Sequence, residues 1–199
     1  MEENHKKEIL SIRNEINEIK YQKNANINNN VNSFFKGSNI IKSNEVDLIL
    51  SWLDKKPKKF KLLLDSNIDG DSWNTFIEKV GNKSPTILFI KTKNNYRFGG
   101  YTSAIWPRNG PARDKASFIF SLDKKEKYKV SKPEGAIGCR ENDWISFGYG
   151  TDIYFYNGFT KGSGCCGNRT YYKLPPDCQI NGGTSTLDIL NCEVYQVEY

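Results

Sequence analysis

The residues whose types and spacing come closest to a metal site lie in the run DSNIDGD. Oxygen-bearing side chains recur there at alternate positions, at Asp65, Asn67, Asp69 and Asp71. A calcium loop uses such oxygens and a glycine at its sharp turn, which Gly70 supplies. The twelfth position of that loop, where a bidentate glutamate belongs, is Phe76. We therefore favour a turn at Asp69-Gly70 before a helix capped by Ser72, and keep weak calcium binding as the alternative.

Thiols are the second group of residues with potential chemistry, and they are Cys139, Cys165, Cys166, Cys178 and Cys192. Their odd number, behind a polar N-terminus unlike an export signal, predicts reduced thiols in a cytoplasmic protein. Because no C-x-x-C spacing occurs, we expect no structural zinc and no other metal. A redox-sensing thiol stays an alternative, since two cysteines share a glycine-rich run, 162–170, with Arg169. We expect that run to be a flexible surface loop.

The single histidine, His5, restricts the catalytic chemistry open to the chain. It lies at the extreme N-terminus, so the body of the protein has no imidazole for a Ser-His or Cys-His nucleophile. We therefore expect a protein that is not an enzyme, with no catalytic residues and no cofactor.

Positive charge is concentrated in one short segment and moderate elsewhere. The densest cluster consists of Lys55, Lys56, Lys58, Lys59 and Lys61. Lysines alternate with aromatic residues there and again over 124–132, a pattern that can meet phosphates and bases. The net charge of +6 suits nucleic acid or an acidic protein surface equally. We favour a solvated loop for the first cluster and keep nucleic-acid binding as an alternative function.

The elements that must position these residues begin with a helix ahead of the main domain. Isoleucines recur at coiled-coil spacing, at Ile9, Ile12, Ile16 and Ile19. Residues 1–23 thus predict a short coiled-coil-like helix, which is too short to be stable alone. Weak self-association through residues 6–20, docking on the domain and a solvated helix all stay open. An Asn-rich linker is expected over 24–37, and the packed domain over 38–199.

Two amphipathic helices are expected at the start of the domain. The first follows Asn44, a plausible N-cap, and ends at Pro57. The second follows Ser72 and presents an apolar face that consists of Trp73, Phe76, Ile77 and Val80.

The rest of the domain has the alternation and turn residues of β-strands. Asn94-Asn95 predicts a tight hairpin turn between strands 86–92 and 96–103. Further strands are expected at 60–64, 117–122, 127–130, 136–139, 144–148, 152–156 and 189–198. Because strands and helices do not alternate, we predict an α+β, predominantly β fold. It consists of two antiparallel sheets in a β-sandwich, with the two helices covering an edge or an end.

Two other features of the sequence bear on the fold. Gly99-Gly100 within a predicted strand indicates a bulge or a point where a backbone or an aromatic ring packs closely. No run of apolar residues approaches the length of a membrane span.

Several segments in order resemble the TLDc domain family, over roughly residues 38–199. The shorter matches are 83–86 and 117–122. The family-motif residues proper are Ser66, Asp69, Gly70, Ser72, Phe98, Gly99, Gly100, Tyr101, Thr102, Ser103, Trp106, Phe147, Gly148, Glu193, Val194 and Tyr195. The chain departs from the family at Ile77, where many members carry histidine, and in the Pro/Gly-rich segment 107–114.

This resemblance implies a β-sandwich bordered by helices and a protein-interaction role. Members of the family are associated with protection against oxidative stress, and several bind the vacuolar-type proton ATPase. No catalytic residues are agreed for the family. The partner expected from the resemblance is therefore a protein, with subunits of that proton pump as the specific candidate.

Overall fold

Two antiparallel six-stranded sheets form the body of the molecule, bordered by short helices. The computed structural model describes residues 5, 9, 12–20, 34–35, 37–150, 152–160, 164–167 and 169–199. For residue 165 it describes the backbone only. The predicted α+β, predominantly β sandwich is thereby confirmed.

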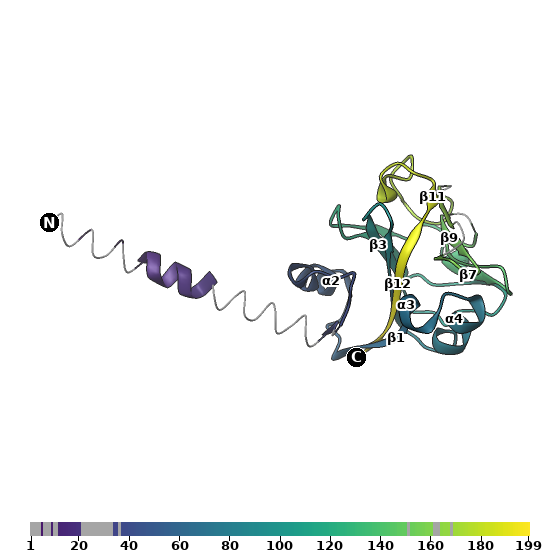
Figure 1. The fold of residues 1–199 in the computed structure, drawn as a ribbon, viewed down its shortest axis with the longest axis horizontal. Helices are drawn as coiled ribbons and strands as arrows, with labels where there is room; N and C mark the ends of the chain where they lie inside the picture. The colour runs from purple at the N-terminus through teal and green to yellow at the C-terminus, as the bar shows by residue number, and fades with distance from the viewer. Residues whose placement is uncertain are drawn as a thin grey trace.

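Sheet A contains most of the predicted strands, and the last strand of the chain lies inside it. Its order is β1 (Lys59–Asp65), β12 (Ile189–Glu198), β2 (Thr86–Thr92), β3 (Arg97–Thr102), β5 (Phe118–Ser121) and β6 (Glu126–Lys129). Figure 1 shows β12 as a long yellow strand next to β1. The hairpin turn between β2 and β3 is as predicted, with Asn95 at a φ of 66°.

Sheet B contains three strands that the sequence did not predict. Its order is β11 (Thr186–Leu187), β10 (Gly164–Cys166), β9 (Ile153–Tyr156), β8 (Trp144–Phe147), β7 (Ile137–Arg140) and β4 (Gly110–Ala112). The missed strands are β4, β10 and β11, and each has only two or three residues. The expectation of a flexible loop over 162–170 was therefore wrong for the part that forms β10, which pairs with β9 and β11.

Sheet A is buried on both faces. Successive side chains of a strand point to opposite sides of the sheet, so neighbouring residues of β2 enter different cores. Leu88 and Ile90 of β2 belong to an inner core between the two sheets. Ile87 and Phe89 belong to an outer core, which the segment 34–53 covers on the side away from sheet B. The molecule thus has three layers, with sheet A in the middle.

The first helical segment covers a face of sheet A and not an edge or an end. It consists of η1 (Ser43–Glu45) and α2 (Val46–Trp52). Trp52 packs on Phe120, with ring centroids 5.2 Å apart. The predicted N-cap at Asn44 was wrong, because that residue lies inside the 3-10 turn. Burial of an apolar stripe against the sheet, more than capping, fixes the position of α2.

The second helical segment borders the inner core beside β1. It consists of α3 (Ser66–Asp69) and α4 (Trp73–Val80). The predicted cap is confirmed, since the Ser72 hydroxyl accepts a hydrogen bond from the Thr75 amide at 3.1 Å. Trp73, Phe76 and Val80 enter the core, as their spacing predicts. Two further 3-10 turns are η2 (Pro133–Gly135) and η3 (Gln179–Asn181).

Among the residues that the structure describes, the packed body already includes Phe34 and Phe35, which lie within the expected linker. The Phe35 ring stacks on Phe60 at a centroid distance of 4.3 Å, and Phe34 meets the same ring edge-on. Residues 21–33, which hold most of the expected linker, lie outside the described residues. Residues 12–20 are helical, and Ile12, Ile16 and Ile19 are between 46% and 67% exposed. Self-association through this helix stays a prediction.

Candidate functional site

The glycine pair of β3 is required by aromatic rings on both sides of the strand. A Cβ atom on Gly100 would lie 2.6 Å from Phe147 Cε2 in the inner core. A Cβ atom on Gly99 would overlap the Leu88 carbonyl oxygen of β2 and would lie 2.8 Å from Phe120 Cζ in the outer core. The register of β3 with both neighbours is unbroken, so close packing and not a bulge explains the pair.

Four other apolar motif residues, Phe98, Trp106, Phe147 and Val194, lie in the inner core, whereas Tyr101 and Tyr195 lie in the outer core. Phe98 and Val194 are fully buried in the inner core. Trp106 packs edge-on against Phe147 with ring centroids 5.4 Å apart, and its indole N–H donates to Thr86 Oγ1 at 3.0 Å. Gly148 has a φ of +79°, a conformation that side chains rarely adopt.

The polar motif residues hold loops in place. Thr102 Oγ1 and the Ser103 amide donate to the same carboxylate oxygen of the buried Asp114, at 2.8 and 2.6 Å. Ser66 donates to Asn191 Oδ1 at 2.8 Å and accepts a bond from the Cys192 amide. Each of these hydroxyls is thereby occupied in joining segments that are distant in the sequence.

The oxygens of the candidate calcium segment do not converge. Asp65 accepts a bond from the Asn67 amide and so caps α3. Asp69 pairs with Lys79 at 2.7 Å, while Asp71 accepts a bond from the Thr160 amide at 3.0 Å. Among the residues that the structure describes, no three His, Cys, Asp or Glu side chains are grouped as a metal would require. The segment is a turn with helix caps, the favoured interpretation.

The Lys79 ammonium group lowers the pKa of the Asp69 carboxyl through its hydrogen bond, against the opposing effect of partial burial. This carboxylate is therefore stabilised in its charged form by a surface ion pair. Its second oxygen accepts the Asp65 amide at 2.9 Å, so the pair also fixes the turn into α3.

The described thiols differ in burial. Cys139, Cys166 and Cys192 are buried, whereas Cys178 is partly exposed. Burial raises the pKa of the Cys139 thiol to about 12 and that of Cys192 well above its ordinary value. Two of the candidate redox thiols thus lie in surroundings that disfavour the thiolate. The side chain of Cys165 lies outside the described residues.

Two buried polar clusters fasten the outer layer to sheet A. In the first, the Glu193 carboxylate of β12 accepts bonds from Ser38 Oγ at 2.6 Å, the Asn39 amide at 2.8 Å and the Tyr195 hydroxyl at 2.9 Å. Glu193 is only 1% exposed. The motif residues Glu193 and Tyr195 therefore anchor the N-terminal segment.

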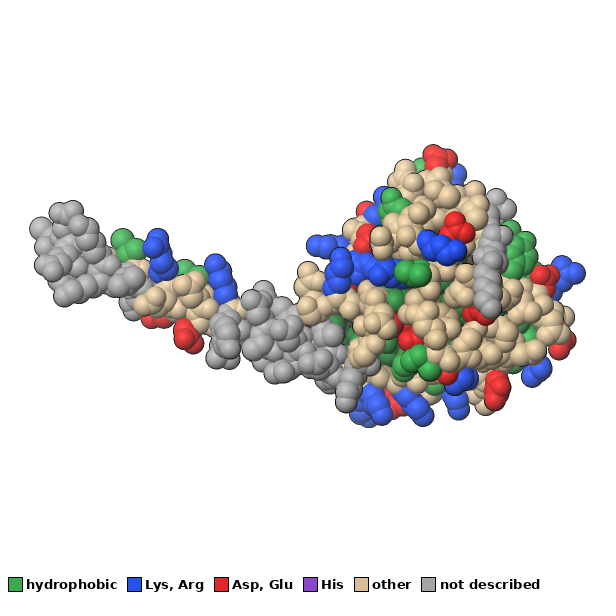
Figure 2. All heavy atoms as spheres, viewed as in Figure 1, with side chains coloured by type: hydrophobic (Ala, Val, Ile, Leu, Met, Phe, Trp, Pro, Cys, Tyr) green, Lys and Arg blue, Asp and Glu red, His purple; other side chains and the backbone are tan. Residues whose placement is uncertain are grey.

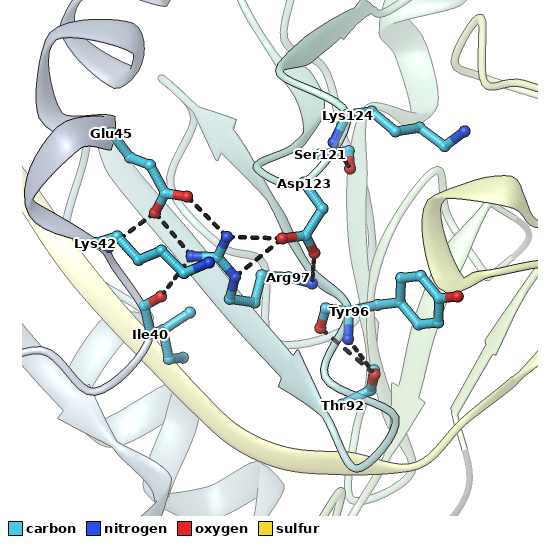
Figure 3. A network of polar contacts seen from close by, with 9 residues as sticks. All are labelled: Ile40, Lys42, Glu45, Thr92, Tyr96, Arg97, Ser121, Asp123 and Lys124. Atoms are coloured by element: carbon cyan, nitrogen blue, oxygen red, sulfur yellow. Dashed lines mark hydrogen bonds and ion pairs between the residues drawn. The ribbon is translucent and has the colours of Figure 1, made fainter.

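In the second cluster, shown in Figure 3, Arg97 of β3 lies between two carboxylates. Its guanidinium donates to both oxygens of Glu45, at 2.7 and 2.8 Å, and to Asp123 Oδ1 at 2.6 Å. It also donates to the Ile40 carbonyl at 3.1 Å. The residue alternation of β3 did not predict a buried arginine at this position, because its partners are 26 and 52 positions away.

An uncovered part of the outer face forms a pocket of about 200 Å³, called here the lysine pocket. It is lined by Trp52 at the end of α2 with the two residues after it, by residues 115–118 before and within β5, and by Lys127, Lys129 and Val130 of β6 and beyond. Tyr101 of β3 lies at its base and stacks on Phe118, with ring centroids 5.1 Å apart and an interplanar angle of 18°.

Three lysines, Lys115, Lys127 and Lys129, line the lysine pocket. Lys127 is held in place, because its ammonium group donates to the Trp52 carbonyl at 2.9 Å and lies 5.0 Å from the centre of the Phe118 ring. Burial first, and then the charge of Lys129, lower the pKa of Lys127. The alternation of lysines around Tyr128 indicated this basic face, but nothing in the sequence placed Lys115 beside it.

The structure connects the first lysine cluster to this pocket through Tyr199. Lys58 Nζ donates to the Tyr199 main-chain oxygen at 3.1 Å, and the Tyr199 hydroxyl lies 3.4 Å from that of Tyr101. The remaining members of the cluster are exposed, namely Lys55, Lys56, Lys59 and Lys61. Figure 2 shows basic side chains gathered along the lower edge of the body and near the position of α2.

Comparisons with known proteins agree with the sequence motifs. The family model described as the TLDc domain matches residues 34–198. The GTPase-activating protein skywalker of Drosophila melanogaster is 34% identical over 84 residues, which are 36% of this chain. The match spans only 14% of that protein's length. In the part of the chain that the structure describes, no helix combines the length and the apolar character needed to cross a membrane.

Proposed function

This chain belongs to the TLDc domain family, and we propose that it is a non-enzymatic protein-interaction module that protects cells against oxidative stress. We propose that it acts in the cytoplasm by binding the vacuolar-type proton ATPase. The family match carries this proposal, and the placement of the motif residues supports it.

The motif residues support an interaction role because their side chains are engaged within the fold. Gly99 and Gly100 admit the rings of Phe120 and Phe147, and Glu193 holds the segment 38–39. Groups engaged in this way are poorly placed to act on a substrate. Recognition then falls to the loops and to the surface of the outer layer.

The skywalker match bears on the enzyme question only in part. The name of that protein assigns it an activity on GTPases, but this chain matches 14% of its length. We propose that the TLDc portion contributes interaction and that this chain does not itself activate a GTPase.

The proposal is tested with purified vacuolar-type proton ATPase and the full chain. We expect the chain to co-sediment with the pump in vesicles and to leave a panel of small GTPases at their intrinsic rates. The control is the same vesicle preparation stripped of the pump. Absence of pump-dependent sedimentation would refute the proposed partner, and accelerated GTP hydrolysis would refute the non-enzymatic role.

Nucleic-acid binding is the second candidate, favoured by the connection between Lys58 and the lysine pocket. It predicts binding of DNA or RNA that weakens steeply with added salt, because several phosphate contacts release counterions. A weak and shallow salt dependence would remove this candidate.

A further inference from the structure

The lysine pocket combines features that a surface patch of lysines lacks. Its volume of about 200 Å³ has a base formed by the Tyr101–Phe118 stack. Lys127 is fixed by the Trp52 carbonyl, so one ammonium group is already oriented before anything binds. Within the described residues, none of the three lysines forms an ion pair with a carboxylate. Asp54 is the single acidic residue among the described lining residues.

The charge balance of the pocket is therefore positive, and Asp54 compensates only part of it. Lys127 and Lys129 repel each other, and a carboxylate placed between them would relieve that repulsion. A partly enclosed position also strengthens such a pairing, since bulk water screens it less.

The size and the base of the pocket distinguish between kinds of occupant. Small-molecule sites usually measure about 300–1,000 Å³, so this pocket suits a side chain better than a cofactor. Single-stranded nucleic acids bind by stacking bases on open aromatic faces. Here Phe118 already stacks on Tyr101 and lies under Lys127, and both rings are less than 10% exposed.

We propose that the lysine pocket binds an acidic segment of a partner protein, with one Asp or Glu side chain inserted among Lys115, Lys127 and Lys129. The proposal rests on the interaction function proposed above and names the chemistry that the partner presents. The exposed lysines at 55–61, which approach the pocket through Lys58 and Tyr199, would contact further acids of the same segment.

The test measures fluorescence anisotropy of a fluorescein-labelled hexaglutamate peptide titrated with the full chain. The informative variant is Lys115→Glu/Lys129→Glu, because both side chains are exposed and Lys127, which supports Trp52, is kept. Its matched control is Lys83→Glu/Lys93→Glu, with the same change of charge away from the pocket. We expect the pocket variant to weaken binding about tenfold or more and the control to leave it within about twofold.

Several outcomes would overturn the inference. These are no binding of hexaglutamate, equal losses in both double variants, or tighter pocket-dependent binding of oligo-dT than of hexaglutamate. A thermal melt of each variant establishes that it is folded. If the pocket variant does not fold, Lys129→Glu against Lys93→Glu gives the same comparison with one charge each.

The same variants separate this inference from the proposed function. If both double variants still co-sediment with the proton pump while hexaglutamate does not bind, the pocket inference fails and the proposed function stands. If the chain binds hexaglutamate through the pocket but never binds the pump, the proposed partner fails and the chemistry of the pocket stands.

Discussion

The two faces of sheet A are buried by different means. The inner face meets sheet B in an apolar core, where Phe147 lies directly against Gly100 and no space remains for a Cβ atom. The outer face is covered by the segment 34–53, which is attached through Glu193 and Arg97 as well as by apolar contacts. Steric fit therefore dominates the inner face, whereas the outer face depends on buried charge and leaves the lysine pocket uncovered.

This difference indicates how the molecule divides its tasks. Most motif residues build the inner core or the loops around it, so that side defines the shared fold. The outer layer is attached by apolar contacts and two buried polar clusters. Beside it, sheet A presents lysines that the motif does not include. Substitutions on the two faces should therefore differ in how much they lower the free energy of unfolding and in how much of the molecule they destabilise.

The largest effect is expected from Gly100→Val. The new side chain would overlap the Phe147 ring, which is itself buried against Trp106 and Tyr172. We therefore expect the free energy of unfolding to fall by more than roughly 4–5 kcal/mol, and no cooperative unfolding. Circular dichroism during a thermal melt measures this. Gly167→Ala is the control, because its Cβ would meet only Cys178 Sγ, at 3.9 Å. A cooperative melt of Gly100→Val near the wild-type midpoint would contradict the prediction.

Arg97→Met is expected to have the next largest effect. It leaves Glu45, only 6% exposed, without its cation, and removing one partner of a buried ion pair costs about 3–5 kcal/mol. Urea unfolding measures the free energy. The control is Arg97→Met/Glu45→Met, which removes both charges and should recover part of the loss. A double variant no more stable than Arg97→Met alone would contradict this account.

The sequence predicted the inner face better than the outer one, for a physical reason. Strand alternation and glycine spacing are local, so β12 was predicted over its observed span, 189–198, and close packing was one of the two explanations offered for Gly99-Gly100. The strands β4, β10 and β11 are too short for a periodic signal, and pairing with neighbours determines them.

The outer face depends on contacts that no local pattern encodes. Arg97 meets Glu45 across 52 positions, and Ser38 meets Glu193 across 155. The lysine pocket collects residues from four separate stretches of chain. Only the alternation of Lys127, Tyr128 and Lys129 could indicate a basic face in advance.

Glu193→Gln is expected to have an intermediate and local effect. Glutamine retains one acceptor oxygen but turns an amide N–H₂ toward donors. Either the bond from the Asn39 amide or the two bonds from Ser38 and Tyr195, which share one oxygen, are therefore lost. The free energy of unfolding is expected to fall by about 1–3 kcal/mol. Hydrogen exchange should accelerate in residues 34–53 and stay slow in sheet B. Uniform acceleration across both sheets would show that the outer layer does not open separately.

The smallest effect is expected from Asp69→Asn, at the turn between β1 and α4. Surface ion pairs contribute about 0.2–1 kcal/mol, and Asp69 and Lys79 are both partly exposed. Because the folded state lowers the pKa of Asp69 below 3.8, its contribution is complete above that pH and is lost as the pH falls through the lowered value. In urea unfolding between pH 7 and pH 2, the difference in the free energy of unfolding between this variant and the wild type should disappear at the acid end.

A matched variant and a calcium titration make this last test specific. Lys79→Met removes the same ion pair from the other side and should show a loss of similar size at pH 7. Millimolar calcium should leave the melting temperature of the wild type unchanged, because the three aspartates serve different partners. A difference in stability that persists to pH 2 would show that the charge of Asp69 does not stabilise the turn. A calcium-dependent stabilisation abolished by Asp69→Asn would show that the segment binds a cation and is more than a helix cap.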